Sequence, residues 1–301
     1  MEDKMSERLN KCPLCKSGHF LNDREVIDHA VSKEKFILCR CTQCNLLFTN
    51  PRPKKKEIEP YYEFPQYYSH TDSTSTFTEK IYNRVRKVNI RKKVRLIESL
   101  IPKGKILDYG CGAGFLLQAL KTRGWEIDGM EPNTKARKKA SQLTNQKIYK
   151  STAFFEEKPK YDVITLFHVL EHIHSLRKTL NKLKKALNPN GYILIAVPNY
   201  KSLDAVKYQE SWAGWDVPRH LYHFSNESIV NLADQFNLAV HEKIPMIFDS
   251  YYVSLLSEKY KNPESNAFSN YINAMRLGWQ SNQKAKKTKE YSSILYILKK
   301  K

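Results

Sequence analysis

The chain has 301 residues, 41% of them hydrophobic, and a mean hydropathy of −0.60, which is typical of a soluble protein with one large domain or a large and a small one. The first residues, Met1-Glu2-Asp3-Lys4, are mostly charged, and no apolar run is long enough to span a bilayer. We therefore expect a cytoplasmic protein without a signal peptide or membrane span. The net charge of +20 is spread along the chain, which favours solvated faces and polar or anionic small substrates over nucleic acid.

The N-terminal residues 1–50 are expected to form a zinc-binding module. They hold two C-x-x-C pairs separated by 25 residues, at Cys12, Cys15, Cys41 and Cys44. Four thiolates in two such pairs suit a tetrahedral, structural zinc ion, and a module of this size has too small a core to fold without a metal. Reduced thiols without metal are the alternative. Cys39 is expected to be a small buried side chain, with a role as a competing zinc ligand as the alternative. His19 and His29 are weaker candidates for zinc ligands.

Residues 51–103 are expected to form a linker and a helical cap. The Pro51-Arg52-Pro53 segment is extended and suits a connection between modules. A long basic amphipathic helix follows and ends before Pro102. Its apolar face is formed by Ile81, Val85, Val88, Val94, Ile97 and Leu100.

Residues 104–301 alternate between predicted strands and helices, which indicates an α/β fold. Because the helices between the strands are short crossovers, the strands should be parallel. The last two strands are expected to form a reversed hairpin pair. The seven predicted strands are 105–109, 126–131, 147–149, 161–167, 192–197, 238–244 and 292–298.

The segment after the first of these strands is typical of a nucleoside-cofactor loop. Asp108 ends the strand, and Gly110, Gly112 and Gly114 follow before an apolar helix pattern. Glycine permits positive φ and a close approach of the ligand, and the helix start presents free N–H groups. A dinucleotide fingerprint would need glycine where Phe115 stands, and a P-loop would need Gly-Lys-Ser/Thr, which is absent.

A second carboxylate, Glu131, follows the next strand 23 residues after Asp108. Both carboxylates should lie at the carboxyl ends of neighbouring strands, next to the topological switch point. A carboxylate there can accept hydrogen bonds from two ribose hydroxyls. The alternatives are another kind of nucleotide-binding domain or a degenerate pseudo-enzyme.

The segment after the fourth strand offers a carboxylate and imidazoles for acid–base chemistry. His172 is our candidate general base, with Glu171 orienting it, because the pKa of histidine lies near neutral pH. A segment that only caps and packs is the alternative. No cysteine follows Cys111, so a cysteine nucleophile in this half of the domain is not expected.

The loop over residues 212–225 is unusually rich in functional residue types, with two Trp, one Arg and two His. Such side chains suit a sugar, a phosphate or another polar anion. His220 in this loop is the alternative base. A lid packed by its tryptophans, with Ser225 capping the next helix, is equally favoured. Further substrate candidates are Asp249, Tyr251 and Tyr252.

The pattern Asp108-x-Gly110-x-Gly112-x-Gly114 resembles motif I of class I S-adenosylmethionine (SAM)-dependent methyltransferases. With the cysteine pairs, Asn50-Pro51-Arg52-Pro53, Glu131-Pro132 and Leu170-Glu171-His172-Ile173, the chain is similar over about residues 12–250 to the small-molecule branch that has an N-terminal zinc module. This branch includes deoxysugar C-methyltransferases, and the chain also resembles the ubiquinone-pathway O-methyltransferases. In the sugar enzymes a Glu-His pair at the position of Glu171 and His172 serves as the base.

The resemblance implies a Rossmann-like sheet of seven strands, with SAM and zinc as cofactors. It places Asp108 near the methionine end of SAM and Glu131 on the ribose. The cofactor-binding residues it implies are Asp108, Gly110, Cys111, Gly112, Gly114, Glu131, Pro132, Phe167 and His168.

The substrate that the resemblance implies is a small polar metabolite, such as a nucleotide-linked or surface-polysaccharide sugar. An acidic residue that many relatives place near the adenine is absent, so we expect backbone groups with Phe154 or Phe155 to hold it. Two other functions remain open: an RNA methyltransferase that uses the basic surface and the zinc module, and a non-catalytic SAM-binding protein.

Overall fold

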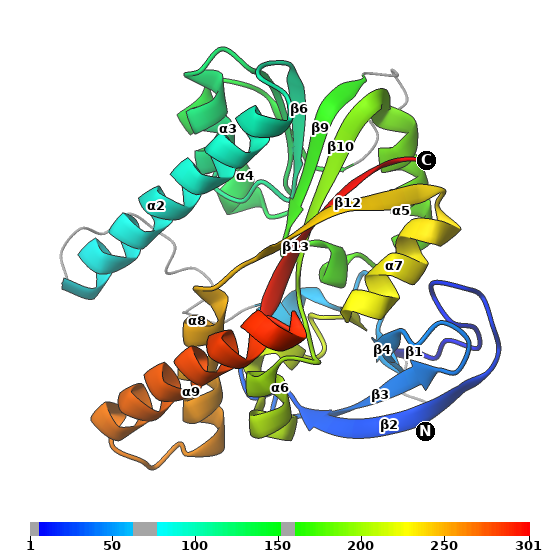
Figure 1. Cartoon of the computed structure of the whole chain (residues 1–301). Coiled ribbons are helices and arrows are strands. Elements are labelled where there is room, and N and C mark those ends of the chain that lie inside the picture. The colour runs from blue at the N-terminus through cyan, green and yellow to red at the C-terminus, as the bar shows by residue number, and fades with distance from the viewer. Residues whose placement is uncertain (1–5, 63–76, 152–159) are drawn as a thin grey trace.

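The computed structural model describes residues 6–62, 77–151 and 160–301, and its centre is a mixed sheet of seven strands (Figure 1). The strand order is β12-β13-β10-β9-β6-β7-β8. The strands are β6 (Lys105–Tyr109), β7 (Glu126–Met130), β8 (Ile148–Tyr149), β9 (Tyr161–Phe167), β10 (Leu187–Pro198), β12 (Leu238–Pro245) and β13 (Ser293–Lys300).

The predicted seven-stranded architecture is confirmed, including the reversed strand near one edge. β10, β9, β6, β7 and β8 pair in parallel, whereas β13 pairs antiparallel with both β10 and β12. β12 therefore runs parallel to β10. The start of β10 was predicted too late, at residue 192. Residues 188–191, Asn-Pro-Asn-Gly, favour a turn, and the structure accommodates them by a register shift between Leu187 and Tyr192.

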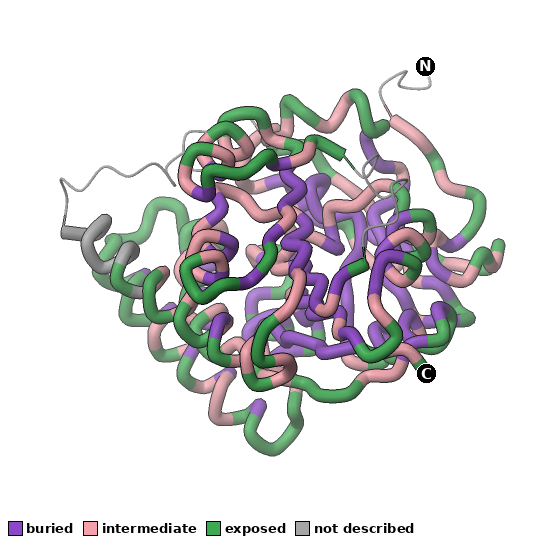
Figure 2. The backbone as a smooth tube through the Cα atoms, turned by 90° about the horizontal axis from the view of Figure 1, so that it is seen from above, coloured by how far each residue is buried: buried purple, intermediate pink, exposed green. Residues whose placement is uncertain are grey.

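Helices cover both faces of this sheet because side chains of a strand alternate between the faces. On β10, Ile193 and Ile195 belong to one buried cluster, and Leu194 and Ala196 belong to the other. The first cluster includes residues of α5 (Leu176–Ala186) and α7 (Asn226–Gln235). The second includes residues of α2 (Phe77–Leu100) and α3 (Phe115–Lys121), and α4 (Thr134–Thr144) packs on α3. Figure 2 shows the buried residues concentrated in the middle of the molecule, with exposed residues around them.

The N-terminal module is joined to the rest of the chain by strand pairing. Its sheet has the order β11-β4-β3-β2, formed by β2 (Phe20–Ile27), β3 (Lys35–Cys41), β4 (Leu47–Thr49) and β11 (Tyr222–His223). β11 comes from the loop after β10. A second small pairing joins β1 (Ser6–Glu7) to β5 (Arg52–Pro53). The division of the chain into 1–50, 51–103 and 104–301 stays a prediction.

Between β12 and β13 the chain forms a helical hairpin of α8 (Asp249–Lys261) and α9 (Ala267–Thr288), next to α6 (Leu203–Tyr208). The hairpin extends away from the sheet, on the same side of the molecule as the start of α2 (Figure 1). No helix in the described ranges combines the length and the apolar character that crossing a membrane requires.

Candidate functional site

The glycine-rich loop between β6 and α3 folds over the end of β7. Gly110, Gly112 and Gly114 have φ angles of 81°, 53° and 80°, which favour glycine. The backbone N–H of Gly110 donates to the carbonyl of Met130, 2.7 Å away. A Cβ atom on Gly112 would meet no atom within 4 Å, whereas one on Gly110 would overlap Val169. The loop is therefore packed at its start and faces open space at Gly112, where a ligand can approach the backbone.

The two carboxylates lie where the sequence placed them, at the ends of neighbouring strands. Asp108 accepts a hydrogen bond of 2.7 Å from the Thr165 hydroxyl. Glu131 accepts from the backbone N–H groups of Gly112, at 2.9 Å, and Asn133, at 2.8 Å. Burial raises the pKa of both groups, that of Asp108 to about 6. Because a carboxylate has about four acceptor positions, Glu131 retains capacity for ligand hydroxyls.

A half-buried lysine completes this edge of the sheet, and no sequence pattern distinguishes it. The Nζ atom of Lys93, from α2, lies 3.6 Å from the centroid of the Phe167 ring at the end of β9. Burial lowers the pKa of Lys93, and the charges of Asp108 and Asp249 oppose this shift. Lys93 was hidden among the other basic residues of its helix.

His168 directly follows β9 and connects it to α8. Its φ of 55° is unusual for a residue other than glycine, and such strain gathers at functional sites. Its Nε2 atom lies 3.0 Å from Asp249 Oδ2, and its Nδ1 atom lies 3.6 Å from Glu171 Oε1. Burial opposes protonation, but these two carboxylates outweigh it and raise the pKa of His168 to about 10. His168 is therefore a cation at neutral pH and has no lone pair with which to act as a base.

Glu171 is the central carboxylate of the site. It lies in the short helix η3 (Leu170–His172), is 0% exposed, and neither of its oxygens has a hydrogen-bond partner in the described part of the chain. Burial alone would raise the pKa of Glu171, but the adjacent histidines, His168 foremost, lower it. Glu171, His172 and His220 offer donor atoms within 4.8 Å of one another. These side chains can bind a proton or a polar ligand between them.

The two candidate bases lie against each other, with ring centroids 4.7 Å apart. The Nδ1 atoms of His172 and His220 lie 3.0 Å from the carbonyls of Arg219 and Gly214 respectively. A carbonyl can only accept, so these contacts favour a hydrogen on each Nδ1, and the lone pair of each ring, when neutral, is then on Nε2. The Tyr62 hydroxyl, 3.1 Å from His172 Nδ1, can also serve as acceptor for the hydrogen on that atom. Burial, with the charge of His220, lowers the pKa of His172 to about 4. His172 is therefore neutral at pH 7, and it is less buried than His220.

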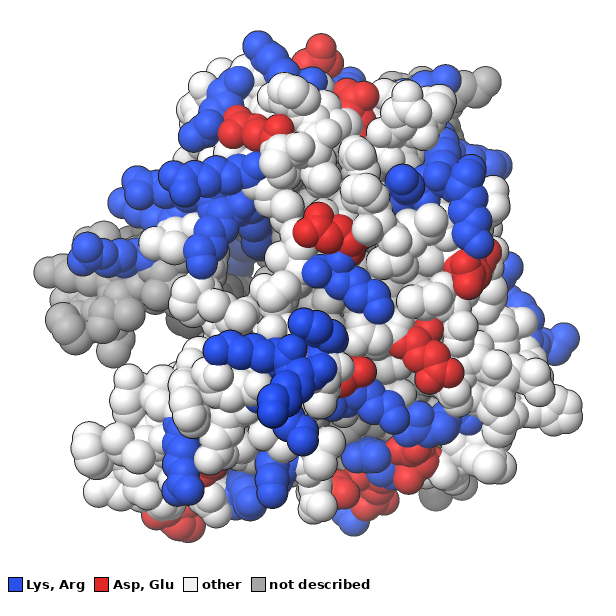
Figure 3. Space-filling model, in the orientation of Figure 1, with Lys and Arg blue, Asp and Glu red and all other residues white. Residues whose placement is uncertain are grey.

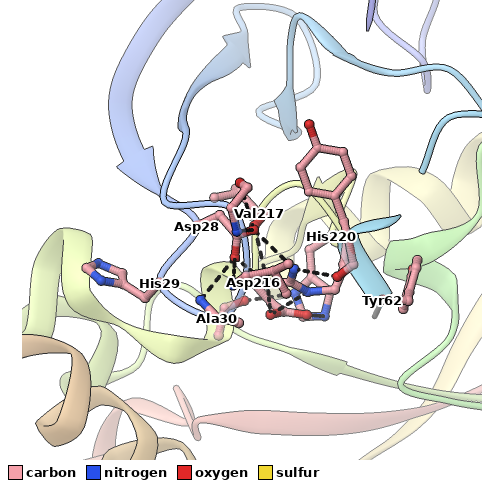
Figure 4. A network of polar contacts seen from close by, with 12 residues as sticks. Asp28, His29, Ala30, Tyr62, Asp216, Val217 and His220 are labelled. Atoms are coloured by element: carbon pink, nitrogen blue, oxygen red, sulfur yellow. Dashed lines mark hydrogen bonds and ion pairs between the residues drawn. The ribbon is translucent and has the colours of Figure 1, made fainter. Parts of the chain in front are cut away.

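The buried guanidinium of Arg219 connects this site to the N-terminal module, within the polar network in which Figure 4 labels Asp28, Asp216 and His220. It pairs with Asp28 at 2.8 Å, from the turn between β2 and β3, and with Asp216 at 2.8 Å. Asp28 in turn accepts hydrogen bonds from the backbone N–H groups of Ala30 and Ser32. The residue whose carbonyl orients His172 is thus fixed by a turn of the small sheet.

The four predicted zinc ligands are brought together. The Sγ atoms are 3.6 Å apart in the Cys12–Cys44 pair and 3.5 Å apart in the Cys15–Cys41 pair, and all four lie within 4.8 Å of one another. Thiolates at about 2.3 Å from zinc in a tetrahedron would be about 3.8 Å apart, so the cluster fits the ion. Cys39 lies outside the cluster and its thiol is 3.4 Å from Asn22 Oδ1, which matches a packing role.

The aromatic loop packs against its own surroundings. Trp212 and Trp215 are 2% and 1% exposed, and their indole N–H groups donate to Asp204 and to the carbonyl of Gln209. Ser225 caps α7 as expected, in a reciprocal capping box with its N3 residue. The loop was expected either to bind substrate or to be a lid packed by its tryptophans, and the burial of both tryptophans matches the packed lid.

The other predicted cofactor residues lie around the same edge. Cys111 donates its backbone N–H to the Met130 carbonyl at 3.0 Å, and the Pro132 carbonyl accepts from Arg137 at 2.8 Å. Whether they contact a cofactor stays a prediction. Phe154 and Phe155 lie outside the described residues.

The chain is similar to known proteins in sequence and in fold. A family model described as a methyltransferase domain matches residues 82–243. The ubiquinone biosynthesis O-methyltransferase of Rickettsia typhi is 25% identical over 242 residues, which cover 73% of this chain and 98% of the relative. The enzyme of that name from Aliivibrio fischeri is 33% identical over 103 residues, 32% of this chain and 44% of the relative. The solved structure of magnesium protoporphyrin IX methyltransferase from Synechocystis PCC 6803, with bound SAH, shares the fold at a TM-score of 0.53 and 15% identity, over 82% of this chain and 100% of that one.

Proposed function

The chain belongs to the methyltransferase domain family and is a SAM-dependent methyltransferase, and we propose that its acceptor is a small polar metabolite, a nucleotide-linked or surface-polysaccharide sugar. The observation that carries this proposal is the Glu171–His172–His220 cluster beside the end of β9. An apolar acceptor would leave the buried Glu171 carboxylate without a hydrogen-bond donor, whereas a hydroxyl-rich acceptor can donate to it.

We propose that Glu131 accepts the ribose hydroxyls of SAM and that Asp108 faces its cationic methionine end. Bound SAM supplies an electrophilic methyl group on a sulfonium. The open space at Gly112 and the buried carboxylates on both sides of it support this placement. Methyl transfer depends mainly on alignment of the acceptor with that methyl group, so the rigid ends of β6, β7 and β9 would contribute through positioning.

His172 is proposed to take the proton of the acceptor hydroxyl at Nε2. Its Nδ1–H is held by the Arg219 carbonyl, which fixes the ring and leaves Nε2 free to accept. The carboxylates of Glu171 and Asp216 favour the resulting imidazolium. His220, whose Nε2 is 4.0 Å from Glu171 Oε1, is the alternative base.

A structural zinc ion is proposed for the cysteine cluster. All four ligand positions of a tetrahedron would be filled by thiolates, so no position would be left open for substrate.

The test of the proposed function starts from a screen of nucleotide sugars for thermal stabilisation of the protein in the presence of SAH. With an acceptor found, single-turnover methyl transfer is measured for wild type, His172→Ala and His220→Ala. Loss of the base should slow transfer by about 10²–10⁴-fold. The exposed His241, on β12, provides the matched control variant His241→Ala, which should keep the wild-type rate.

The other two functions are distinguished by the same experiments. Salt-dependent binding of RNA together with methyl transfer to RNA would replace the sugar proposal by an RNA substrate. SAM binding without turnover on any fraction would favour a non-catalytic SAM-binding protein. If both histidine variants keep the wild-type rate, the imidazole mechanism is wrong and transfer relies on proximity alone.

A further inference from the structure

The α8–α9 hairpin concentrates the exposed apolar surface of the protein. Of the eleven large apolar side chains exposed in the described part of the chain, seven lie between residues 247 and 279. Four of them form what we call the α9 face: Phe268, Tyr271, Ile272 and Trp279, which are 72%, 51%, 48% and 55% exposed. Exposed apolar patches of this kind mark sites of association with a protein or a membrane.

The α9 face is present because α9 buries small residues and exposes large apolar ones, the reverse of the usual arrangement. The side packed on α8 is lined by small or polar residues, among them Ala274, Gly278 and Ser281. A Cβ atom on Gly278 would lie 2.8 Å from Tyr251 Cδ1, so α8 and α9 approach closely there. Phe268, Ile272 and Trp279, at spacings of four and seven residues, share the opposite side. The large side chains of this helix therefore point to solvent while its small ones are buried.

The charges around the α9 face are predominantly positive. Residues 267–283 contain one charged residue, Arg276, and the exposed lysines Lys284, Lys286, Lys287 and Lys289 follow directly. Of the acidic residues of the hairpin, Asp249 pairs with His168, Glu258 is buried, and Glu264, in the turn between α8 and α9, is exposed. Figure 3 shows a mostly uncharged surface over the hairpin at the lower left, with a basic and an acidic group toward its lower edge and a cluster of basic side chains beside it.

A second basic element extends toward the same side. The exposed residues of α2 include Arg84, Lys87, Arg91, Lys92 and Arg95, and Figure 1 shows α2 and α9 reaching outward together. A net charge of +20 opposes close association with another copy of the chain but favours an anionic surface.

We propose that the α9 face docks on the surface of an anionic lipid bilayer, with α9 lying in the plane of the interface. Aromatic and aliphatic side chains would enter the boundary between headgroups and acyl chains, and the flanking lysines would contact the lipid phosphates. The docked helix would lie near the methyl-transfer site, because Asp249, the first residue of α8, pairs with His168. The proposal does not depend on the identity of the acceptor.

The test is cosedimentation of the full chain with vesicles of phosphatidylcholine alone and of phosphatidylcholine with phosphatidylglycerol in equal parts. We expect binding to the anionic vesicles only, weakened by salt. Phe268→Ser combined with Trp279→Ser should reduce partitioning by at least about tenfold, because two large apolar side chains no longer leave water. Leu21→Ser, which changes a side chain 68% exposed on β2, is the matched control and should bind as wild type does.

Two further measurements distinguish a loss of membrane binding from a loss of folding. SAH binding and thermal unfolding of the double variant should match wild type, which shows that the fold is intact. The proposal is overturned if wild type does not bind anionic vesicles, or if the double variant binds them equally well. It is also overturned if light scattering shows a dimer that the double variant abolishes, because the α9 face would then bind a second copy.

Discussion

Arg219 and Asp28 form a buried ion pair across 191 residues of sequence, with Nη2 and Oδ1 2.8 Å apart and side chains 2% and 0% exposed. One partner belongs to the small N-terminal sheet and the other to the loop that carries His220. Since the Arg219 carbonyl also orients His172, the N-terminal module contributes to the geometry of the candidate base.

Removing one partner of this pair should be strongly destabilising. Arg219→Met would leave Asp28 charged and buried, at a cost of about 3–5 kcal/mol in the free energy of unfolding. Adding Asp28→Asn should restore part of this loss, since the uncompensated charge is gone. Urea unfolding of the two single variants and the double variant measures the coupling. Additive effects would show that the pair does not act as a unit.

Glu131→Ala should weaken SAM binding measured by calorimetry. The loss of charged hydrogen bonds to the ribose should cost about 1.5–3 kcal/mol. Because Glu131 also accepts the N–H groups of Gly112 and Asn133, thermal unfolding must be followed in parallel. Glu131→Gln, which keeps one acceptor oxygen, should lose less affinity. An unchanged affinity of Glu131→Ala would remove this residue from the cofactor site.

The protein should contain one zinc ion per chain, and Cys44→Ser should lose it. Cys39→Ser is the matched control, because Cys39 is a cysteine of the same sheet whose thiol lies outside the cluster. Metal analysis of freshly purified, reduced protein measures both variants. Full zinc content in Cys44→Ser, or no zinc in wild type, would contradict the prediction.

The affinity for SAM should depend on pH through Asp108. Its pKa is raised to about 6 by burial, so the carboxylate is ionised above about pH 7 and protonated below its pKa. If Asp108 contacts the cationic methionine end, affinity falls by up to about tenfold for each pH unit below 6. Lys93→Met removes a charge that lowers the pKa of Asp108, so the fall should begin at a higher pH. Calorimetry over about pH 5 to 8 tests this, and a flat profile for both proteins would exclude Asp108 from the contact.

The parts of the fold that follow local patterns were predictable, and those built from distant contacts were not. The limits of β6 and β9 were predicted because apolar runs end at Asp108 and Phe167, next to clear turn or polar segments. β11 is two residues long and is defined by its pairing with β4, so it is too short to produce a periodic pattern in the sequence. The α8–α9 hairpin was missed because its buried side consists of small and polar residues.

The candidate site divides in the same way. The glycine loop, Glu131 and the cysteine pairs have characteristic spacings, so single residues could be named. In the sequence Lys93 resembles the other cations of its basic helix, and only the fold places it against the Phe167 ring. The protonated state of His168 depends on Asp249, which lies 81 residues further along the chain, beyond the reach of any local pattern.

The position of β13, between β10 and the edge strand β12, has a consequence for the order in which the protein can fold during synthesis. Among the described residues β12 forms strand pairs only with β13, so it cannot pair into the sheet until residues 293–300 have left the ribosome. Until then β10 has an open edge, and the hairpin with its apolar α9 face is tethered by an unpaired strand. A nascent chain at this stage exposes both an unpaired strand edge and an apolar helix, the features that recruit chaperones or cause aggregation. Its folding yield should therefore be especially sensitive to changes in β13.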